Sequence, residues 1–116
     1  MKVGHSEIFV SDPAEAKRFY VDVLGFVLEA DQGGQFIWVR SGEALFLLRP
    51  GRVAGAASDY QSAASALVLY TDDLDAECER LRGRGLAFSG TDGSDRCPTF
   101  RDPDGNWFQL VNPEEH

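Results

Sequence analysis

The sequence predicts an α+β fold made of two copies of one strand–helix–hairpin module. Segment 5–25 recurs about sixty residues later as segment 66–85, with Asp12 and Asp73 at matching positions. In each copy a short strand leads to an aspartate, then to an amphipathic helix that ends at a glycine, and then to a hairpin. Because a repeat at a fixed offset sets the architecture, we expect two tandem modules.

The first helix is predicted by its capping residues and its apolar spacing. Asp12 is a typical N-cap, Pro13 suits the first helical position, and Glu15 stands three residues after the cap. Apolar residues then recur at spacings of three and four, at Ala16, Phe19, Tyr20, Val23 and Leu24. We expect Gly25 to end this helix.

The second helix is predicted in the same way. Asp73 is its expected N-cap, and its apolar stripe consists of Leu74, Cys78 and Leu81. Gly83 or Gly85 is expected to supply a left-handed end. Cys78 is therefore interpreted as a small core side chain.

Alternating apolar residues and turn residues predict the strands. Segments 7–10 and 67–70 open the modules, 36–40 and 43–48 form one hairpin, and 99–101 and 106–111 form another. The first hairpin is expected to turn at Ser41 and Gly42, and the second at 102–105.

Composition bounds the class of protein. The 116 residues predict a single domain, with module one over about 1–50, a crossover loop over about 51–65 and module two over about 66–116. Two cysteines make no disulfide framework, and the absence of a long apolar run or a signal-peptide pattern favours a cytoplasmic protein without membrane contact. The net charge of -8 disfavours nucleic acid as a partner.

The crossover loop is rich in Gly, Ala and Ser and shows no helical stripe. Two interpretations stand side by side: a mobile loop near a ligand site, or a spacer between the modules.

The order of elements and the residues that cap and end them resemble those of the vicinal oxygen chelate superfamily, which includes glyoxalase I, extradiol dioxygenases and bleomycin-resistance proteins. The residues that carry the likeness are His5 seven before Asp12, Phe19 and Tyr20 with Leu24, Gly25 and Phe26, and the terminal segment DPDGNWFQLV at 102–111. The resemblance implies two βαβββ modules whose strands form a concave mixed sheet, with helices on its outer face and a cavity inside. It also implies a homodimer. The fold alone does not assign a function, because the superfamily spans lyases, epimerases, dioxygenases and drug-sequestering binders.

Strand alternation predicts which side chains line that cavity. His5, Glu7 and Phe9 share one face of the first strand. A turn at Ser41 and Gly42 would pair Trp38 with Leu45 and Phe36 with Leu47, and Phe100 is expected opposite Trp107. The expected ligand-binding residues are His5, Glu7, Phe9, Phe36, Trp38, Arg40, Leu47, Tyr70, Phe100, Trp107 and Gln109. Such a lining suits a planar or hydrophobic small molecule, although these rings are also ordinary core material.

The resemblance also allows the metal-ligand positions of the family to be compared with this sequence. The four metal-ligand positions of the family fall on His5, near Leu47, on Ala66 and on Gln109. A divalent ion needs at least three converging donors, and this set offers an imidazole and an amide. We therefore expect no cofactor; a divalent metal at His5 and Gln109 is the alternative.

Several polar residues keep more than one interpretation. Glu7 is a satisfied polar partner of His5, a ligand-binding carboxylate, or a general base tuned by burial, in that order of preference. Arg52 and Arg101 are interpreted as surface ion-pairing residues, whereas Arg40 and Arg49 stay open between that role and ligand recognition. No catalytic residue is assigned, and Glu7 is the weak candidate.

Cys97 is the remaining open residue. It lies next to Pro98 and could sit at the rim of the cavity, but no neighbour in the sequence marks it as an activated thiolate.

Two functions from different classes follow. The first is a metal-independent protein that binds a small aromatic or hydrophobic molecule, as in antibiotic sequestration. The second is an enzyme: a metal-dependent lyase or dioxygenase, or a metal-free isomerase that uses Glu7 as base. The missing metal ligands and the aromatic lining favour the binder.

Overall fold

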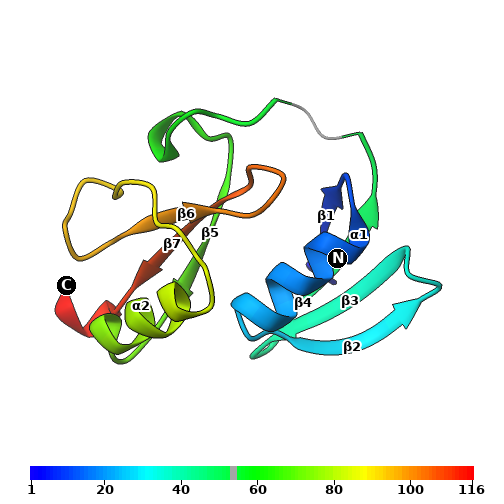
Figure 1. Ribbon diagram of the computed structural model, residues 1–116, viewed down its shortest axis with the longest axis horizontal. Coiled ribbons are helices and arrows are strands. Elements are labelled where there is room, and N and C mark those ends of the chain that lie inside the picture. The colour runs from blue at the N-terminus through cyan, green and yellow to red at the C-terminus, as the bar shows by residue number, and fades with distance from the viewer. Residues whose placement is uncertain (53–54) are drawn as a thin grey trace. The chain divides into compact units, whose positions relative to one another are not determined.

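The computed structural model describes residues 1–52 and 55–116 and divides the chain into two compact units, Met1–Ala54 and Gly55–His116. Each unit has one sheet and one main helical segment (Figure 1). The predicted α+β class is therefore confirmed. In the described parts of the chain, no helix is both long enough and apolar enough to span a membrane.

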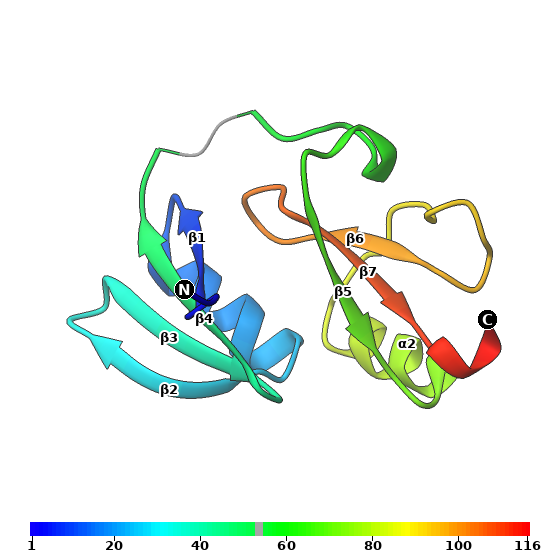
Figure 2. The same ribbon diagram turned by 180° about the vertical axis from the view of Figure 1, so that it is seen from behind.

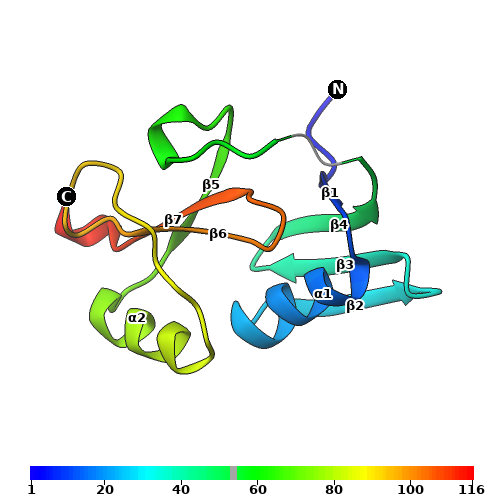
Figure 3. The same ribbon diagram turned by 45° about the horizontal axis from the view of Figure 1, so that its top comes forward.

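The first unit is a complete βαβββ module. Its strands are β1 (Ser6–Val10), β2 (Val27–Gln32), β3 (Phe36–Ser41) and β4 (Ala44–Pro50), in the spatial order β1-β4-β3-β2. Strands β1 and β4 are parallel, and the other neighbours are antiparallel. Figure 3 shows the helical segment lying along one face of this sheet.

That segment begins where the sequence predicts but changes its winding. The Asp12 carboxylate accepts hydrogen bonds from the amides of Ala14 (3.1 Å) and Glu15 (3.3 Å), and α1 spans Pro13–Lys17. Residues Arg18–Val23 then form a π-helical turn rather than the expected α-helix. Apolar spacing does not distinguish this wider winding from an α-helix, because both leave one stripe facing the sheet.

The second unit contains β5 (Ala66–Tyr70), α2 (Leu74–Gly83), β6 (Thr99–Arg101) and β7 (Trp107–Val111), with the strand order β5-β7-β6 (Figure 2). Single 3-10 turns lie at Tyr60–Ser62 and Pro113–Glu115. The expectation of a second full βαβββ module is wrong in one detail. Where another strand was expected after the helix, the described residues form one isolated bridge between Thr91 and Pro98.

The ends of α2 agree with the sequence. Asp73 accepts a hydrogen bond from the Ala76 amide, and the stripe of Leu74, Cys78 and Leu81 is buried. Gly85, at φ +97°, supplies the left-handed end, and the amide of Leu86 donates to the carbonyl of Leu81 at 3.0 Å. The core interpretation of Cys78 is therefore confirmed.

The first hairpin turns one residue later than expected. Ser41 pairs with Ala44, so Gly42 and Glu43 form the turn, and Trp38 pairs with Leu47 instead of Leu45. Gly42 has φ +56°, which fits a type II′ turn because that turn places glycine at its first central position. The register moves by two residues, and every side chain stays on its predicted face.

In the second hairpin the pairing differs from the expected register by one residue, and this shift moves a side chain to the opposite face of the sheet. Phe100 pairs with Phe108, and Trp107 pairs with Arg101. Phe100 is fully buried and stacks on Phe108 with ring centroids 4.9 Å apart. The prediction that Phe100 lies opposite Trp107 is therefore wrong: Phe100 belongs to the core face of this sheet.

Candidate functional site

Three charged or polar side chains form a linked group on the sheet of the first unit. His5 Nε2 donates to Glu7 Oε2 at 2.9 Å, and Arg49 Nη1 donates to Glu7 Oε1 at 3.0 Å. The register explains the proximity, because β1 lies beside β4 with Phe9 next to Arg49. Both carboxylate oxygens of Glu7 are therefore engaged.

These contacts decide the chemistry of Glu7. Hydrogen bonds from His5 and then from Arg49 lower the pKa of this carboxyl below its ordinary value, outweighing desolvation. Glu7 is also exposed rather than buried. The general-base interpretation required burial to raise this pKa, whereas the surroundings of Glu7 lower it by stabilising the carboxylate.

Aromatic rings surround this group. Trp38 meets His5 edge to face with ring centroids 4.8 Å apart, and its indole N–H donates to Gln32 Oε1 at 3.3 Å. The Arg49 guanidinium carbon lies 5.6 Å from the centroid of the Phe9 ring and 5.4 Å from that of the Phe36 ring. Both distances are within the range of cation–π attraction.

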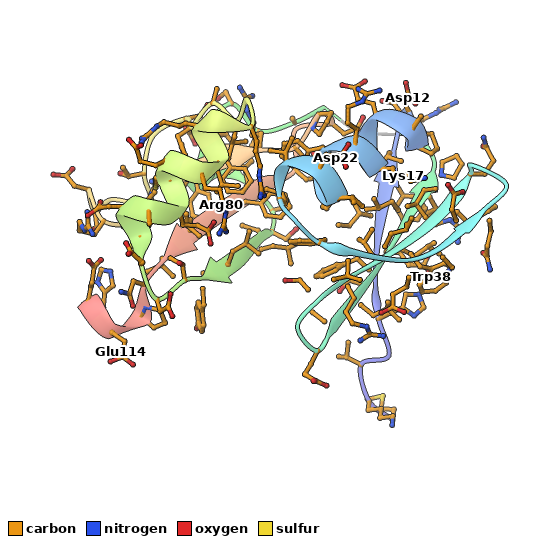
Figure 4. The ribbon with its side chains drawn as sticks, turned by 60° about the horizontal axis from the view of Figure 1, so that its bottom comes forward. Asp12, Lys17, Asp22, Trp38, Arg80 and Glu114 are labelled. Carbon is orange, nitrogen blue, oxygen red and sulfur yellow. The ribbon has the colours of Figure 1, made fainter. Side chains whose placement is uncertain are left out.

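We call this surface the aromatic face. It consists of His5, Glu7, Phe9, Phe36, Trp38 and Arg49. Phe9 leaves 50% of its surface exposed, although it is a large apolar side chain. Figure 4 shows Trp38 on the side of the sheet away from Asp12 and Asp22 of the helical segment. The face is thus opposite the packed core of this unit.

Two predicted residues of the first unit have other roles. Leu47 is paired with both Glu7 and Trp38 in the sheet register but is buried. Arg40 donates from Nε to Glu29 Oε1 at 2.7 Å, so it is a surface ion-pairing residue. The expected set of ligand residues omits Arg49, although strand alternation from Leu47 places it on the same face.

In the second unit, the predicted residues Trp107 and Gln109 are covered by residues 55–62, which we call the crossover segment. The Trp107 indole N–H donates to the carbonyl of Ala57 at 3.0 Å, and Gln109 Nε2 donates to the hydroxyl of Tyr60 at 3.0 Å. The Tyr60 and Trp107 rings meet edge to face at 6.1 Å. Trp107 is consequently only 4% exposed.

The crossover segment contains a capped turn and a hydrogen bond to a distant part of its own unit. Asp59 accepts a hydrogen bond from the Ser62 amide at 2.9 Å and caps the 3-10 turn of Tyr60–Ser62. Gln61 Nε2 donates to the carbonyl of Thr91 at 3.0 Å. Apart from this single turn, residues 55–65 form no helix or strand, as expected of a loop, and residues 53–54 of the predicted loop lie outside the described parts.

The remaining predicted residues of this unit do not join a single cluster. Tyr70 is 75% exposed, and Phe100 lies in the core. Arg101 stacks over Trp107 with 5.2 Å between the guanidinium carbon and a ring centroid, instead of pairing with a surface carboxylate as expected. Of the eleven predicted ligand residues, the aromatic face brings together His5, Glu7, Phe9, Phe36 and Trp38.

Burial disfavours the thiolate form of both cysteines. Burial raises the pKa of both the Cys78 and the Cys97 thiols. Cys97 is buried, and its Sγ lies 3.4 Å from His116 Nε2. Its neighbour Arg96 is bound by Glu115 and Asp75, and these carboxylates raise the pKa of the guanidinium.

Residues 2–110 match the family model described as the Glyoxalase/Bleomycin resistance protein/Dioxygenase superfamily. The chain belongs to this superfamily.

Several known proteins resemble the chain over nearly its full length. TnmS3, an antibiotic binding protein from Streptomyces sp. CB03234, is 35% identical, with 97% of this chain and 98% of that chain covered and a TM-score of 0.66. The Bacillus subtilis protein YurT is 31% identical, with 96% of this chain and 98% of YurT covered. A lactoylglutathione lyase from Agrobacterium tumefaciens is 18% identical, with coverages of 99% and 96% and a TM-score of 0.72, which shows a shared fold alone.

The metal positions of the superfamily do not fit a divalent ion in this chain. Leu47 and Ala66 have no donor atoms in their side chains, and the Gln109 amide is bonded to Tyr60. Among residues 1–52 and 55–116, no three His, Cys, Asp or Glu side chains are grouped so that they could hold a metal ion. His5 is instead bonded to Glu7.

Proposed function

We propose that the chain is a metal-independent binding protein that holds a planar aromatic or hydrophobic small molecule on the aromatic face. The observation that carries this proposal is the exposure of Phe9 and Phe36 around a guanidinium that is itself fixed by Glu7. Aromatic rings offer large contact areas at small entropic cost, and a few polar groups fix the orientation of a ligand. The ligand class includes antibiotics, since TnmS3 is an antibiotic binding protein.

The chemistry of the face supports binding over catalysis. The Glu7 carboxylate is engaged at both oxygens and has a lowered pKa, so it is a weak proton acceptor. Both thiols are buried with raised pKa values. Neither Glu7 nor either thiol is therefore favoured as a base or nucleophile.

A fluorescence titration tests the proposal. In a Trp107→Phe background, Trp38 is the sole tryptophan and reports on the aromatic face. We expect saturable quenching by at least one member of a panel of planar aromatic antibiotics and metabolites. Trp38→Ala, followed by calorimetry, should weaken that binding by about tenfold, because an aromatic contact contributes on the order of 1 kcal/mol beyond its buried area.

A graded variant serves as the control. Trp38→Phe keeps a ring but loses the indole N–H bonded to Gln32, so its affinity should lie between those of the wild type and Trp38→Ala. Binding that is equal in all three proteins would contradict the proposal.

Metal independence needs a separate test. Protein purified without chelator should hold substoichiometric Zn, Ni, Mn or Fe, and adding these ions should leave the melting temperature unchanged apart from weak nonspecific effects. A stoichiometric ion bound through His5 and Gln109 would overturn this part and favour the enzyme alternative.

We also propose a homodimer. Strand β2 is an edge of its sheet, and its Val27 and Leu28 are exposed apolar side chains, a combination that proteins often cover with a partner. Light scattering at micromolar concentration should return twice the mass of the chain, and a monomer would refute this.

A further inference from the structure

The hydrogen-bonding groups of the aromatic face are unequally occupied. Each oxygen of Glu7 accepts a hydrogen bond, and the indole N–H of Trp38 donates to Gln32. Arg49 uses Nη1 for Glu7, but its buried Nε has no hydrogen-bond partner in the described residues. The Arg49 side chain is 36% exposed, so the exposed N–H groups of its guanidinium can donate to a ligand, whereas the buried Nε is out of a ligand's reach.

The guanidinium of Arg49 is held in one orientation by its neighbours. The Phe9 and Phe36 rings and Glu7 together hold the guanidinium in place. Its donors are consequently preorganised, and a bound molecule can use them with little further ordering.

The charges of the protein favour a neutral ligand over an anionic one. Glu7 already balances the charge of Arg49 in a direct ion pair. The chain as a whole carries a net charge of -8, which repels anions. A neutral acceptor satisfies the donor without this repulsion, and a conjugated carbonyl places such an acceptor in the plane of an aromatic ring.

We propose that the ligand is a neutral planar aromatic ketone or quinone and that Arg49 determines this specificity by donating to its carbonyl oxygen. The inference rests on the proposed function and deepens it by naming the ligand class. In this arrangement Phe9 and Phe36 contact the ring system, while Glu7 positions the guanidinium and does not touch the ligand.

A matched pair of probes tests the inference. Fluorenone and fluorene share one planar ring system and differ by a carbonyl in place of a methylene. Both are titrated against the full chain in the Trp107→Phe background, with quenching corrected by a free tryptophan standard. Fluorenone should bind about tenfold more tightly, as expected for one hydrogen bond to a charged donor.

Variants then assign the preference to one side chain. Glu7→Gln/Arg49→Met removes the guanidinium without leaving an unpaired carboxylate, and it should bind both probes with the affinity of fluorene for the wild type. Glu7→Gln alone keeps the guanidinium. The logarithm of its fluorenone-to-fluorene affinity ratio should be at least half of the wild-type value. Arg49→Lys keeps a charged donor and serves as a second variant if the double variant does not fold, with a preference of less than about threefold.

The outcomes separate the two proposals. Equal binding of both probes by the wild type would overturn the ketone inference and leave the proposed function standing. A fluorenone preference that survives the loss of Arg49 would overturn the role of that residue. No saturable quenching by either probe or by the wider panel would overturn both proposals together.

Discussion

Replacing Phe100 tests the corrected register of the second hairpin. Phe100 is fully buried and stacks on Phe108 at a centroid distance of 4.9 Å. Truncating a buried phenylalanine costs about 3–5 kcal/mol, and losing the ring pair accounts for roughly 0.5–1.5 kcal/mol of that sum. Because a domain is stable by only about 5–15 kcal/mol, Phe100→Ala should remove a large part of the free energy of unfolding.

The assay is urea unfolding followed by far-UV circular dichroism. With a slope of about 1–3 kcal/mol per molar urea, the midpoint should fall by more than about 1 M in Phe100→Ala. Phe9→Ala is the matched control, because this phenylalanine is half exposed and its loss should cost about 1 kcal/mol or less. Phe100→Leu, with a smaller loss, covers the case in which the alanine variant does not fold.

Ligand binding gives the refuting result. Phe100→Leu should lower stability and leave the fluorenone affinity unchanged within about twofold. Phe9→Ala should lower the fluorenone affinity and change the stability little. A stable Phe100→Leu protein that no longer binds fluorenone would place Phe100 on the ligand side. The observed pairing of Phe100 with Phe108 could not then be correct.

Three further predictions concern individual residues. The folded-state pKa of Glu7 lies below its ordinary value of 4.5, so the stabilisation from this carboxylate is present above pH 4.5 and is lost as the pH falls through the folded pKa. Carbon NMR titration should show the lowered pKa of Glu7, and Arg49→Met should raise this pKa. Trp107→Phe removes the N–H that holds the Ala57 carbonyl and should speed hydrogen exchange in the crossover segment, whereas unchanged exchange would mean that this bond does not hold it. Cys97 should react with a thiol reagent far more slowly in the native state than in urea, and equal rates would contradict its burial and raised pKa.

The sequence predicted local structure well where one short segment contains the whole signal. Asp12 and Asp73 cap their helices as expected, because the bonds of an N-cap are made within three residues. The π-helical turn at Arg18–Val23 was missed, since the stripe on which the prediction rested is shared by both kinds of winding.

The two hairpins show why predicted faces can survive or fail. In the first, the pairing of Trp38 moved by two residues along the partner strand, from Leu45 to Leu47, and the face was kept. In the second, the partner of Phe100 moved by one residue, from Trp107 to Phe108, and the face was lost. Side chains alternate with a period of two, so only an odd shift reverses them.

The geometry of the turn causes that odd shift. The amide of Asp102 donates to the carbonyl of Asn106, and the Asp102 carboxylate accepts from the Asn106 amide at 2.8 Å. This closes a loop of three residues, 103–105, where the sequence had suggested four. Loop length is set by contacts across the turn, which composition alone does not reveal.

The polarity of the candidate site also depends on contacts that the sequence does not show. Taken alone, Glu7 is an acceptor suited to cationic or donor-bearing ligands. Arg49 comes from a strand forty-two residues away in sequence, and its bond to Glu7, together with that from His5, occupies both carboxylate oxygens. The carboxylate thereby becomes a support for the guanidinium, and the available group of the face changes from an acceptor to a donor. A ligand that complements Glu7 and one that complements Arg49 therefore have opposite hydrogen-bonding character, and the fluorenone carbonyl complements Arg49.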